Sequence, residues 1–248
     1  WTYFANDVAY HMDKVNRGYK NLVNVLGADH TGYIKRITAA VSALSEKKIK
    51  LNCKVCQLVK LFKNGEPFKM SKRAGDFISA QDLLSEVDKD PIRFMMLNRS
   101  NDVELDFDFD KVKEKTKDNP VFYVQYAYAR INSLLRTLNL SFVEKIEFDE
   151  IDFTHNVIEE KIIRKVFEWP KIIESATRKF DLHKIPFYLY ELSTLLHAYW
   201  SKGNEDKRYK FIENERIKRK EILAIINLVA IVIKNGMGIL DVSLPKRM

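Results

Sequence analysis

The sequence has few of the residues that mark secreted, fibrous and membrane proteins. It contains 2 cysteines, 8 glycines and 6 prolines in 248 residues. Two cysteines are too few for a disulfide-stapled secreted fold, and so little glycine and proline argues against disorder or fibrous repeats. The longest apolar run, "ILAIINLVAIVI" at 222–233, is too short to span a bilayer. No amino-terminal run resembles a signal peptide. We therefore expect a cytoplasmic protein in which residues 222–233 form a buried core helix.

Positive charge is abundant instead. Lys and Arg number 42 against 34 Asp and Glu, for a net charge of +8 and a pI near 9.2. Such a balance favours a polyanionic partner. The excess is shared equally between residues 1–118 and 119–248, so any anion-binding face must be assembled by folding. The hydrophobic fraction of 46% is enough for a sizeable core.

The first part of the chain predicts an α/β arrangement. Residues 2–15 can form a helix with Thr2 as its cap. A short buried strand at 22–26 ends in the turn "GADH", and one helix face then follows at Ile34, Ile37, Val41 and Leu44. A strand, turn and helix in this order belong to a parallel sheet, where ligands bind at the carboxyl end of the strand.

Further local signals lie between residues 57 and 118. Asn64-Gly65 predicts a hairpin between apolar runs. Ser79 can cap one helix, and Pro91 is tolerated in the first turn of the next. The stretch "VELDFDFD" at 103–110 alternates apolar and acidic residues, so it predicts a half-buried strand or the approach to a helix.

From residue 119 the pattern becomes entirely helical. Asn119 is a candidate cap and Pro120 opens a helix. The remaining helices are predicted at 156–180, 183–201 and 210–234, the last closed by Asn235-Gly236 as a carboxyl cap. The chain is therefore expected to have two domains, residues 1–118 and 119–248, of mixed α/β and all-α class.

Two apparent metal or redox motifs are weak. Cys53-x-x-Cys56 has no second pair of zinc ligands, and it leads into a strand instead of opening a helix, so both are interpreted as ordinary buried or half-buried thiols. The histidines are scattered, and only His30, beside Asp29 at a strand end, lies where ligands bind; His11, His155, His183 and His197 are interpreted as packing or surface residues. We predict no metal site.

Two other patterns each allow two interpretations. The stretch "EPFKMSKRAGDF" places Lys69, Lys72 and Arg73 around a serine, as either a solvated turn or a cationic loop that meets phosphate. Tyr123, Tyr126 and Arg130 are spaced by three and four residues, which puts them on one helix face. They form either an aromatic core stripe or a surface for an unstacked nucleic-acid base. In the second case Phe122 and Val124 can fill the core instead.

A family resemblance bears on both patterns. "KMSKR" resembles the KMSKS loop of class I aminoacyl-tRNA synthetases. The blocks "TYFANDVAYHMDKVNRGY", "NVLGADHTGYIKR", "DPIRFMMLNRSNDVELDFD" and "NPVFYVQYAYARINSLLR" are similar, in order and spacing, to arginyl-tRNA synthetase. The tail, from "FYLYELSTLLHAYW" to the terminal Met, resembles that family's helical anticodon-binding domain. The resemblance covers essentially the whole chain. It implies the carboxyl-terminal part of a Rossmann-type α/β catalytic domain at 1–118, followed by an all-α anticodon-binding domain at 119–248.

The resemblance also implies an activity. In this family ATP and Mg²⁺ support the attachment of arginine to its tRNA through an arginyl-adenylate, and we expect a cytoplasmic monomer without membrane contact. Lys72 would stabilise the leaving pyrophosphate and Lys69 would support closure of the loop, both as catalytic residues. The other ATP-binding residues carried over from the family are Gly27, Asp29, His30, Met70 and Ser71.

Arginine and the anticodon have their own residues in the family pattern. Tyr3 and Asp7 would bind arginine, because a carboxylate suits a guanidinium and a spacing of four puts both on one helix face. An anticodon base would be received by a set that includes the last residue of the chain: Tyr123, Tyr126, Arg130 and Met248.

The sequence also departs from the family. Arg73 replaces the last Ser of the loop, no His-Ile-Gly-His motif occurs, and the amino-terminal tRNA-contacting domain is missing. We therefore expect the carboxyl-terminal portion of such an enzyme, unable to activate arginine alone. Two alternatives stay open: a tRNA-binding module without catalysis, or another class I synthetase such as the cysteinyl or methionyl enzyme, which often carries zinc.

Overall fold

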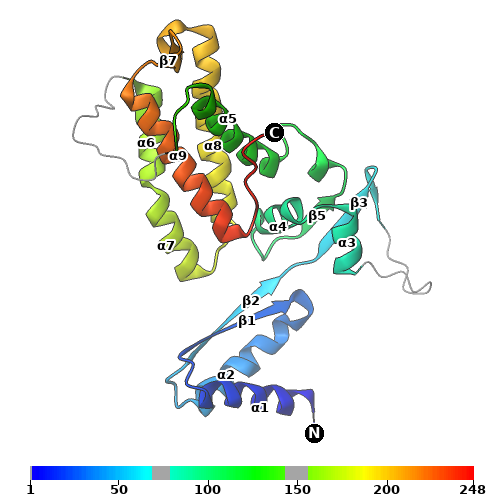
Figure 1. Ribbon diagram of the computed structural model, residues 1–248. Coiled ribbons are helices and arrows are strands. Elements are labelled where there is room, and N and C mark those ends of the chain that lie inside the picture. Colours follow the sequence, from blue (N-terminus) through cyan, green and yellow to red (C-terminus); the bar gives the residue numbers. More distant parts are fainter. Residues whose placement is uncertain (1, 69–78, 143–155) are drawn as a thin grey trace. The chain divides into compact units, whose positions relative to one another are not determined.

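The computed structural model describes residues 2–68, 79–142 and 156–248 (Figure 1). The chain forms two compact units. Unit 1 comprises Trp1–Lys60 and Asn101–Asp106, and unit 2 comprises Leu61–Ser100 and Phe107–Met248. The predicted fold class, an α/β part followed by a helical part, is confirmed.

Unit 1 contains the predicted strand, turn and helix. Its elements, in chain order, are α1 (Tyr3–Asn16), β1 (Asn21–Gly27), the 3-10 helix η1 (Ala28–Tyr33), α2 (Ile34–Leu44) and β2 (Lys50–Cys56). β1 and β2 pair in parallel, from Asn21 opposite Lys50 to Gly27 opposite Cys56. Leu22, Ile37, Val41 and Leu51 form the core of this unit. Parallel pairing needs a crossover of this kind, which α2 supplies.

A hairpin and a short strand follow β2. β3 (Val59–Lys63) and β4 (Glu66–Pro67) are antiparallel, and β5 (Leu105–Asp108) pairs on the other side of β3. Asn64 and Gly65 both have positive φ, 55° and 76°, which is the geometry expected of a two-residue hairpin turn. β5 buries Leu105 and Phe107 and exposes Asp106, so "VELDFDFD" contains the predicted half-buried strand.

Two short helices lead to the helical part of unit 2. α3 (Ala80–Glu86) begins at Ser79, whose hydroxyl accepts from the Asp82 amide while the Asp82 carboxylate accepts from the Ser79 amide. This capping box satisfies two first-turn donors and confirms Ser79 as the cap. α4 (Lys89–Leu97) carries Pro91 in its first turn, as predicted, and a short 3-10 helix, η2 (Lys111–Lys113), follows β5.

Five longer helices build the rest of unit 2, and Figure 1 shows them packed together as a bundle. They are α5 (Pro120–Thr137), α6 (Val157–Phe167), α7 (Trp169–Lys179), α8 (Lys184–Glu205) and α9 (Lys220–Leu240). Between α8 and α9 lie η3 (Lys207–Tyr209) and a small hairpin of β6 (Ile212–Glu213) and β7 (Arg216–Ile217). One continuous apolar core runs through the bundle and includes Val124, Leu192, Ile225 and Val229, each fully buried.

Three predicted details of the helical part are wrong. The helix predicted at 156–180 is two helices that break at Glu168, because Pro170 lacks an amide hydrogen and cannot continue α6. Asn119 stands at the N-cap position of α5 without capping it. Its amide group donates instead to the carbonyls of Val112 at 2.9 Å and Glu114 at 2.7 Å.

The third error concerns the last helix. α9 begins at Lys220, after the hairpin, and continues through Gly236 to Leu240, where Asp241 adopts a left-handed conformation with φ of 55°. Gly236 is therefore not a cap. A Cβ atom there would lie 2.7 Å from a methyl group of Leu189 on α8, so glycine lets the two helices approach closely.

α9 contains the apolar run of the sequence. By length and composition it could cross a membrane, and within the described ranges it is the one helix of that kind. Most of its residues are buried in the bundle, including Ile222, Ile226 and Ile233 with no exposed area. The predicted core helix is thus confirmed, although it is longer than the apolar run.

Candidate functional site

The carboxyl end of β1 gathers three predicted ATP-binding residues. Gly27 ends the strand, and Asp29 and His30 stand in η1 directly after it. His30 Nε2 lies 3.5 Å from Asp29 Oδ2, and both side chains are largely exposed. A Cβ on Gly27 would lie 2.6 Å from Asp29 Oδ1, so glycine leaves room for this carboxylate to fold back on the strand end. An exposed carboxylate and imidazole at a strand end can meet the hydroxyls of a ribose.

Asp7 is tied to this strand end by a residue that the sequence interpretation missed. The Tyr33 hydroxyl donates to Asp7 Oδ2 at 2.5 Å, and the Tyr33 ring meets the His30 ring edge-on with centroids 6.4 Å apart. Burial, then the hydrogen bond to Asp7, raises the pKa of Tyr33 to about 12, so the hydroxyl keeps its proton near neutral pH. Tyr33 stands in the "GADHTGY" stretch, three residues after His30, so the sequence could have suggested it as a site residue. Tyr3, by contrast, is 93% exposed.

His11 supports the same arrangement from the other side. It is buried, its Nδ1 donates to the Asp7 carbonyl at 2.7 Å, and its Nε2 accepts from the Asn24 amide at 2.9 Å. The bond with Asn24 joins α1 to β1, which agrees with the packing role expected of His11. Asp7 is therefore held through its backbone by His11 and through its carboxylate by Tyr33.

The predicted catalytic loop cannot be placed. Lys69, Met70, Ser71 and Lys72 lie outside the described residues. The described flanks are the β3–β4 hairpin before the loop and the Ser79 capping box after it.

The predicted anticodon residues meet two side chains of α8. The ring centroid of His197 lies 4.3 Å from that of Tyr123 and 5.4 Å from that of Tyr126, the second pair being stacked. The Arg130 guanidinium lies 4.2 Å from the Trp200 ring centroid and 5.4 Å from that of Tyr126. We call this group the aromatic cluster; it comprises Tyr123, Tyr126 and Arg130 of α5 and His197 and Trp200 of α8.

Hydrogen bonding defines the charge state of His197. Arg130 Nη1 lies 3.1 Å from His197 Nδ1, and a guanidinium has no acceptor, so Nδ1 accepts. The proton then resides on Nε2, which donates to the Tyr123 carbonyl at 3.2 Å. Burial, with a further contribution from Arg130, lowers the pKa of His197 to about 4. The imidazole is a neutral aromatic ring that orients Arg130. The sequence interpretation of His197 as a packing residue missed its contact with Arg130. In "HAYW", His197 and Trp200 are three residues apart and so lie on one face of α8, which could have suggested that they act together.

The aromatic cluster lies at the edge of the bundle core and is not a core stripe. Tyr126 is 38% exposed, and Tyr123 and Arg130 are half-buried. Val124 fills the core, as the sequence suggested. Phe122, suggested as a second core residue, is instead half-buried and stacked on Tyr126, with ring centroids 5.8 Å apart and planes 8° apart. An exposed aromatic face beside a guanidinium suits an unstacked base.

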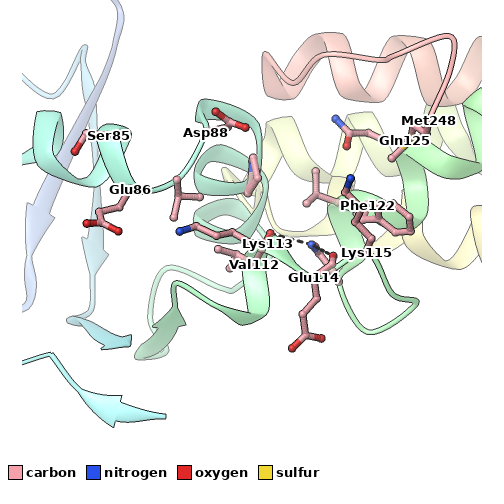
Figure 2. A pocket seen from close by; sticks show the side chains of 14 residues that line it. Ser85, Glu86, Asp88, Val112, Lys113, Glu114, Lys115, Phe122, Gln125 and Met248 are labelled. Atoms are coloured by element: carbon pink, nitrogen blue, oxygen red, sulfur yellow. Dashed lines mark hydrogen bonds between the residues drawn. The ribbon is translucent and has the colours of Figure 1, made fainter. Parts of the chain in front are cut away.

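Met248 lies on the Phe122 side of Tyr126. It lines a pocket of about 320 Å³ together with Phe122 and Gln125 of α5 (Figure 2). The same pocket is lined by Asn119, by residues 112–115 and by the turn between α3 and α4. The terminal residue thus shares a pocket with Phe122, the ring that stacks on Tyr126 of the aromatic cluster.

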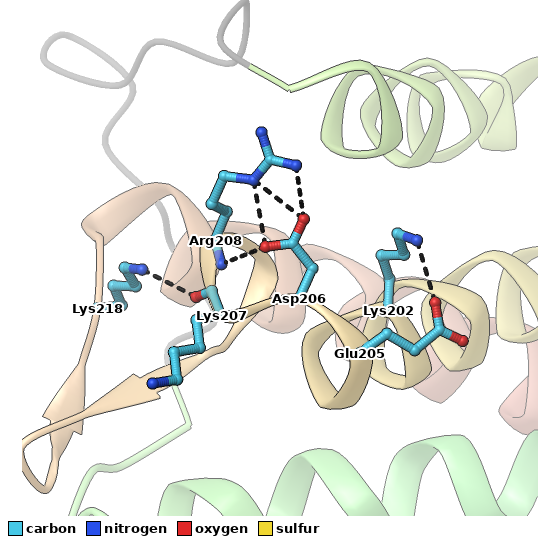
Figure 3. Close-up of polar contacts among 6 residues, drawn as sticks. All are labelled: Lys202, Glu205, Asp206, Lys207, Arg208 and Lys218. Atoms are coloured by element: carbon cyan, nitrogen blue, oxygen red, sulfur yellow. Dashed lines mark hydrogen bonds and ion pairs between the residues drawn. The ribbon is translucent and has the colours of Figure 1, made fainter.

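A basic segment follows Trp200 along the chain and joins α8 to α9 (Figure 3). Arg208 forms a bidentate pair with Asp206, and its hydrogen bond holds the pKa of that carboxyl at about 2. Lys218 donates to the Lys207 carbonyl at 3.0 Å, which ties the start of the segment to its end. Exposed cations of this kind suit the phosphates of a nucleic acid.

The described residues offer no group of three or more His, Cys, Asp or Glu side chains placed to hold a metal ion. Cys53 and Cys56 are free thiols of β2. Cys53 is half-buried, as predicted, and burial raises its pKa, whereas Cys56 is exposed, because it ends the strand.

Comparison with known proteins defines the class. Residues 124–248 match the DALR anticodon binding domain family. The chain therefore belongs to the DALR anticodon binding domain family.

The similarity extends beyond this domain. The chain is 55% identical over 248 residues to an arginine–tRNA ligase of Pelagibacter ubique, an alignment that covers all of this chain and 43% of that protein. Among solved structures it is similar to a candidate arginyl-tRNA synthetase of Campylobacter jejuni, with 30% identity, a TM-score of 0.83, and coverage of 100% of this chain and 52% of that one. The arginyl-tRNA synthetase of Plasmodium falciparum shares the fold at 17% identity, with a TM-score of 0.76 and coverage of 100% and 45%.

The resemblance predicted from the sequence, to the carboxyl-terminal part of arginyl-tRNA synthetases, is thus confirmed. The chain spans less than half the length of the Pelagibacter relative.

Proposed function

We propose that this chain contributes to the ATP-dependent attachment of arginine to its tRNA, and that unit 2 binds the anticodon. The observation that carries the proposal is the aromatic cluster, of which all members except Tyr123 lie in residues 124–248, the region that matches an anticodon binding domain. Tyr126 offers an exposed ring for stacking, and Arg130 is held beside it by His197 and Trp200. A guanidinium oriented in advance loses less freedom when it binds a base edge or a phosphate.

The chemistry proposed for the whole enzyme is attack of the arginine carboxylate on the α-phosphate of ATP. This step forms arginyl-adenylate and releases pyrophosphate. Asp7 would bind the arginine guanidinium, with Tyr3 beside it as a ring and hydroxyl. Gly27, Asp29 and His30 would hold the ribose. Lys72, with Lys69 closing the loop over Met70 and Ser71, would stabilise the pyrophosphate.

Mg²⁺ would neutralise the phosphate charge during this step. It usually binds through the substrate's phosphates and only one or two carboxylates. We further propose that residues 1–118 and 119–248 are the functional divisions of the chain, and that the protein is a cytoplasmic monomer. Because the sequence contains no His-Ile-Gly-His motif, we expect this chain alone to show no arginine-dependent ATP–pyrophosphate exchange.

The proposed anticodon site is tested by the binding of two transcripts. One is an arginine tRNA and the other differs at the middle anticodon base, and both are titrated at 50 and 200 mM salt. We expect tighter binding of the matched transcript at both concentrations. Stacking on an aromatic side chain contributes about 1–3 kcal/mol per base, so Tyr126→Ala should lower the preference about tenfold.

Phe187→Ala is the matched control. Phe187 is another exposed aromatic residue of the bundle, on α8, and its loss should leave the preference unchanged. Equal binding of both transcripts by the unaltered chain, with a collapse at higher salt, would leave only phosphate attraction and refute the site. A further outcome would favour the alternative of a tRNA-binding module without catalysis. In that outcome the chain still prefers the matched transcript, but it shows no catalysis even when it is joined to the segment encoded upstream of it.

A further inference from the structure

The eight residues after α9, here called the C-terminal tail (residues 241–248), are bonded to α4. Asp90 Oδ1 accepts from the Ser243 amide at 3.1 Å, and Asp90 Oδ2 accepts from the Ser243 hydroxyl. Two contacts flank this pair: Arg93 Nε donates to the Leu240 carbonyl at 2.7 Å, and Lys89 Nζ lies 3.0 Å from Asp241 Oδ2. One turn of α4 thus holds the point where the chain leaves α9.

Gln125 joins this contact to α5. Its Nε2 donates to the Ser243 carbonyl at 3.0 Å and to Asp90 Oδ2 at 3.3 Å. Farther along the tail, Arg136 of α5 donates to the Lys246 carbonyl at 2.9 Å. The tail therefore runs along α5, the helix that carries Tyr123, Tyr126 and Arg130. Gln125 and Met248 line the same pocket (Figure 2).

Asp90 accepts from both donors of Ser243, its amide and its hydroxyl, and also from the side-chain amide of Gln125. A carboxylate is suited to this because its two oxygens accept several hydrogen bonds and donate none. Charge-assisted bonds of this type are stronger than neutral ones. Without the carboxylate, Ser243 and Gln125 lose their common acceptor, and among the described residues Ser243 keeps only the bond from Gln125 to its carbonyl.

We propose that Asp90 is a positioning residue for anticodon recognition, which fixes the C-terminal tail so that Met248 stands beside Phe122 and the aromatic cluster. This inference rests on the proposed function of unit 2. Asp90 lies on α4, before the region that matches the anticodon binding domain, residues 124–248. Anticodon recognition by this domain would therefore depend on a helix that precedes the matched region.

The first test measures the tail directly. The Ser243 amide donates to Asp90, so its hydrogen exchange reports the contact without any tRNA. In Asp90→Asn we expect this amide, and the peptide 241–248, to exchange at least tenfold faster. Asp118→Asn is the control, because it removes the same charge from an exposed position of the same unit that lies outside this network. Equal exchange in all three proteins would overturn the proposal.

The second test measures recognition. The ratio of dissociation constants for the matched and altered transcripts should fall at least fivefold in Asp90→Asn and stay unchanged in Asp118→Asn. In a chain that ends at Val242, the substitution should have no further effect, because Asp90 then has no Ser243 to hold. A further loss of preference when Asp90→Asn is introduced into the truncated chain would show that Asp90 acts through the fold and not through the tail, which would also overturn the proposal.

The two tests separate the failure of this inference from the failure of the proposed function. If the unaltered chain does not distinguish the transcripts, the anticodon site is refuted, and with it a role for Asp90 in recognition. If the unaltered chain distinguishes them and Asp90→Asn does so equally well, the anticodon site stands and the positioning role is refuted. Thermal unfolding of both variants confirms that each is folded at the temperature of the binding assay.

Discussion

Two glycines of α9 provide a sharp test of how α8 and α9 pack. Gly236 and Gly238 stand two residues apart in one helix, so an alanine at either position gains about 1 kcal/mol of helix propensity. Their surroundings differ. A Cβ at Gly236 would lie 2.7 and 2.8 Å from the two methyl carbons of Leu189, whereas one at Gly238 would meet no atom within 4 Å.

Leu189 has no exposed area, so it cannot swing into solvent to make room. Extra methyl groups in such a site cost about 1–3 kcal/mol. Gly236→Ala should therefore lower the free energy of unfolding by about 1 kcal/mol, and Gly238→Ala should raise it by up to about 1 kcal/mol. The difference between the variants isolates the packing cost, since the propensity gain is common to both.

Unfolding of the bundle is followed by tryptophan fluorescence, because Trp169 and Trp200 both lie in it. At about 2–4 °C per kcal/mol for a chain of this size, a difference of about 2 kcal/mol separates the two midpoints by roughly 4–8 °C. In a Leu189→Ala background, Gly236→Ala should become stabilising, because the new methyl enters vacated space. Equal stabilisation by both alanines in the unaltered background would refute the close approach of α8 and α9.

Two further predictions concern buried ionisable groups. The pKa of His197 falls from its usual value near 6.5 to about 4 in the folded chain, so the unfolded chain binds the proton more readily. Stability should be full above pH 6.5 and decline by about 3 kcal/mol as the pH falls to 4, a loss that urea titrations should not find in His197→Gln. Glu159 is fully buried and accepts from both Tyr199 and Arg219, so Arg219→Ala should cost about 3 kcal/mol by leaving the carboxylate without its cation. Adding Glu159→Gln should restore part of that loss in thermal unfolding, and an equal cost in the double variant would contradict the role of the buried charge.

Local features were predictable wherever nearby residues decide the backbone. The Asn64-Gly65 turn follows from the ability of both residues to adopt positive φ. The start of α3 follows from Ser79 and Asp82, which satisfy one another's amides within three residues. The periodic apolar face of α2 likewise predicted Ile37 and Val41 as buried residues.

The candidate site was predictable only in part. The spacing of Tyr123, Tyr126 and Arg130 correctly places them on one face of α5, because a helix repeats every 3.6 residues. Their partner His197 is 74 residues away from Tyr123. No periodicity on one helix reveals which side chain of another helix will stand opposite it, so the neutral imidazole that orients Arg130 emerged from packing. The same holds for Tyr33, 26 residues from Asp7.

The class of the chain followed from its family resemblance, and neighbouring residues were enough to predict the Asn64-Gly65 turn, the Ser79 cap and the helices with periodic apolar faces. The effects of distant residues on one another emerged from packing. Gly236 resembles a helix cap in the sequence, yet it lies inside α9 because Leu189 requires a residue without a side chain there. Asn119 resembles a cap as well, yet its amide group bonds Val112 and Glu114. In both cases a contact with another element replaces the local role, because burial makes that contact worth more than the local preference.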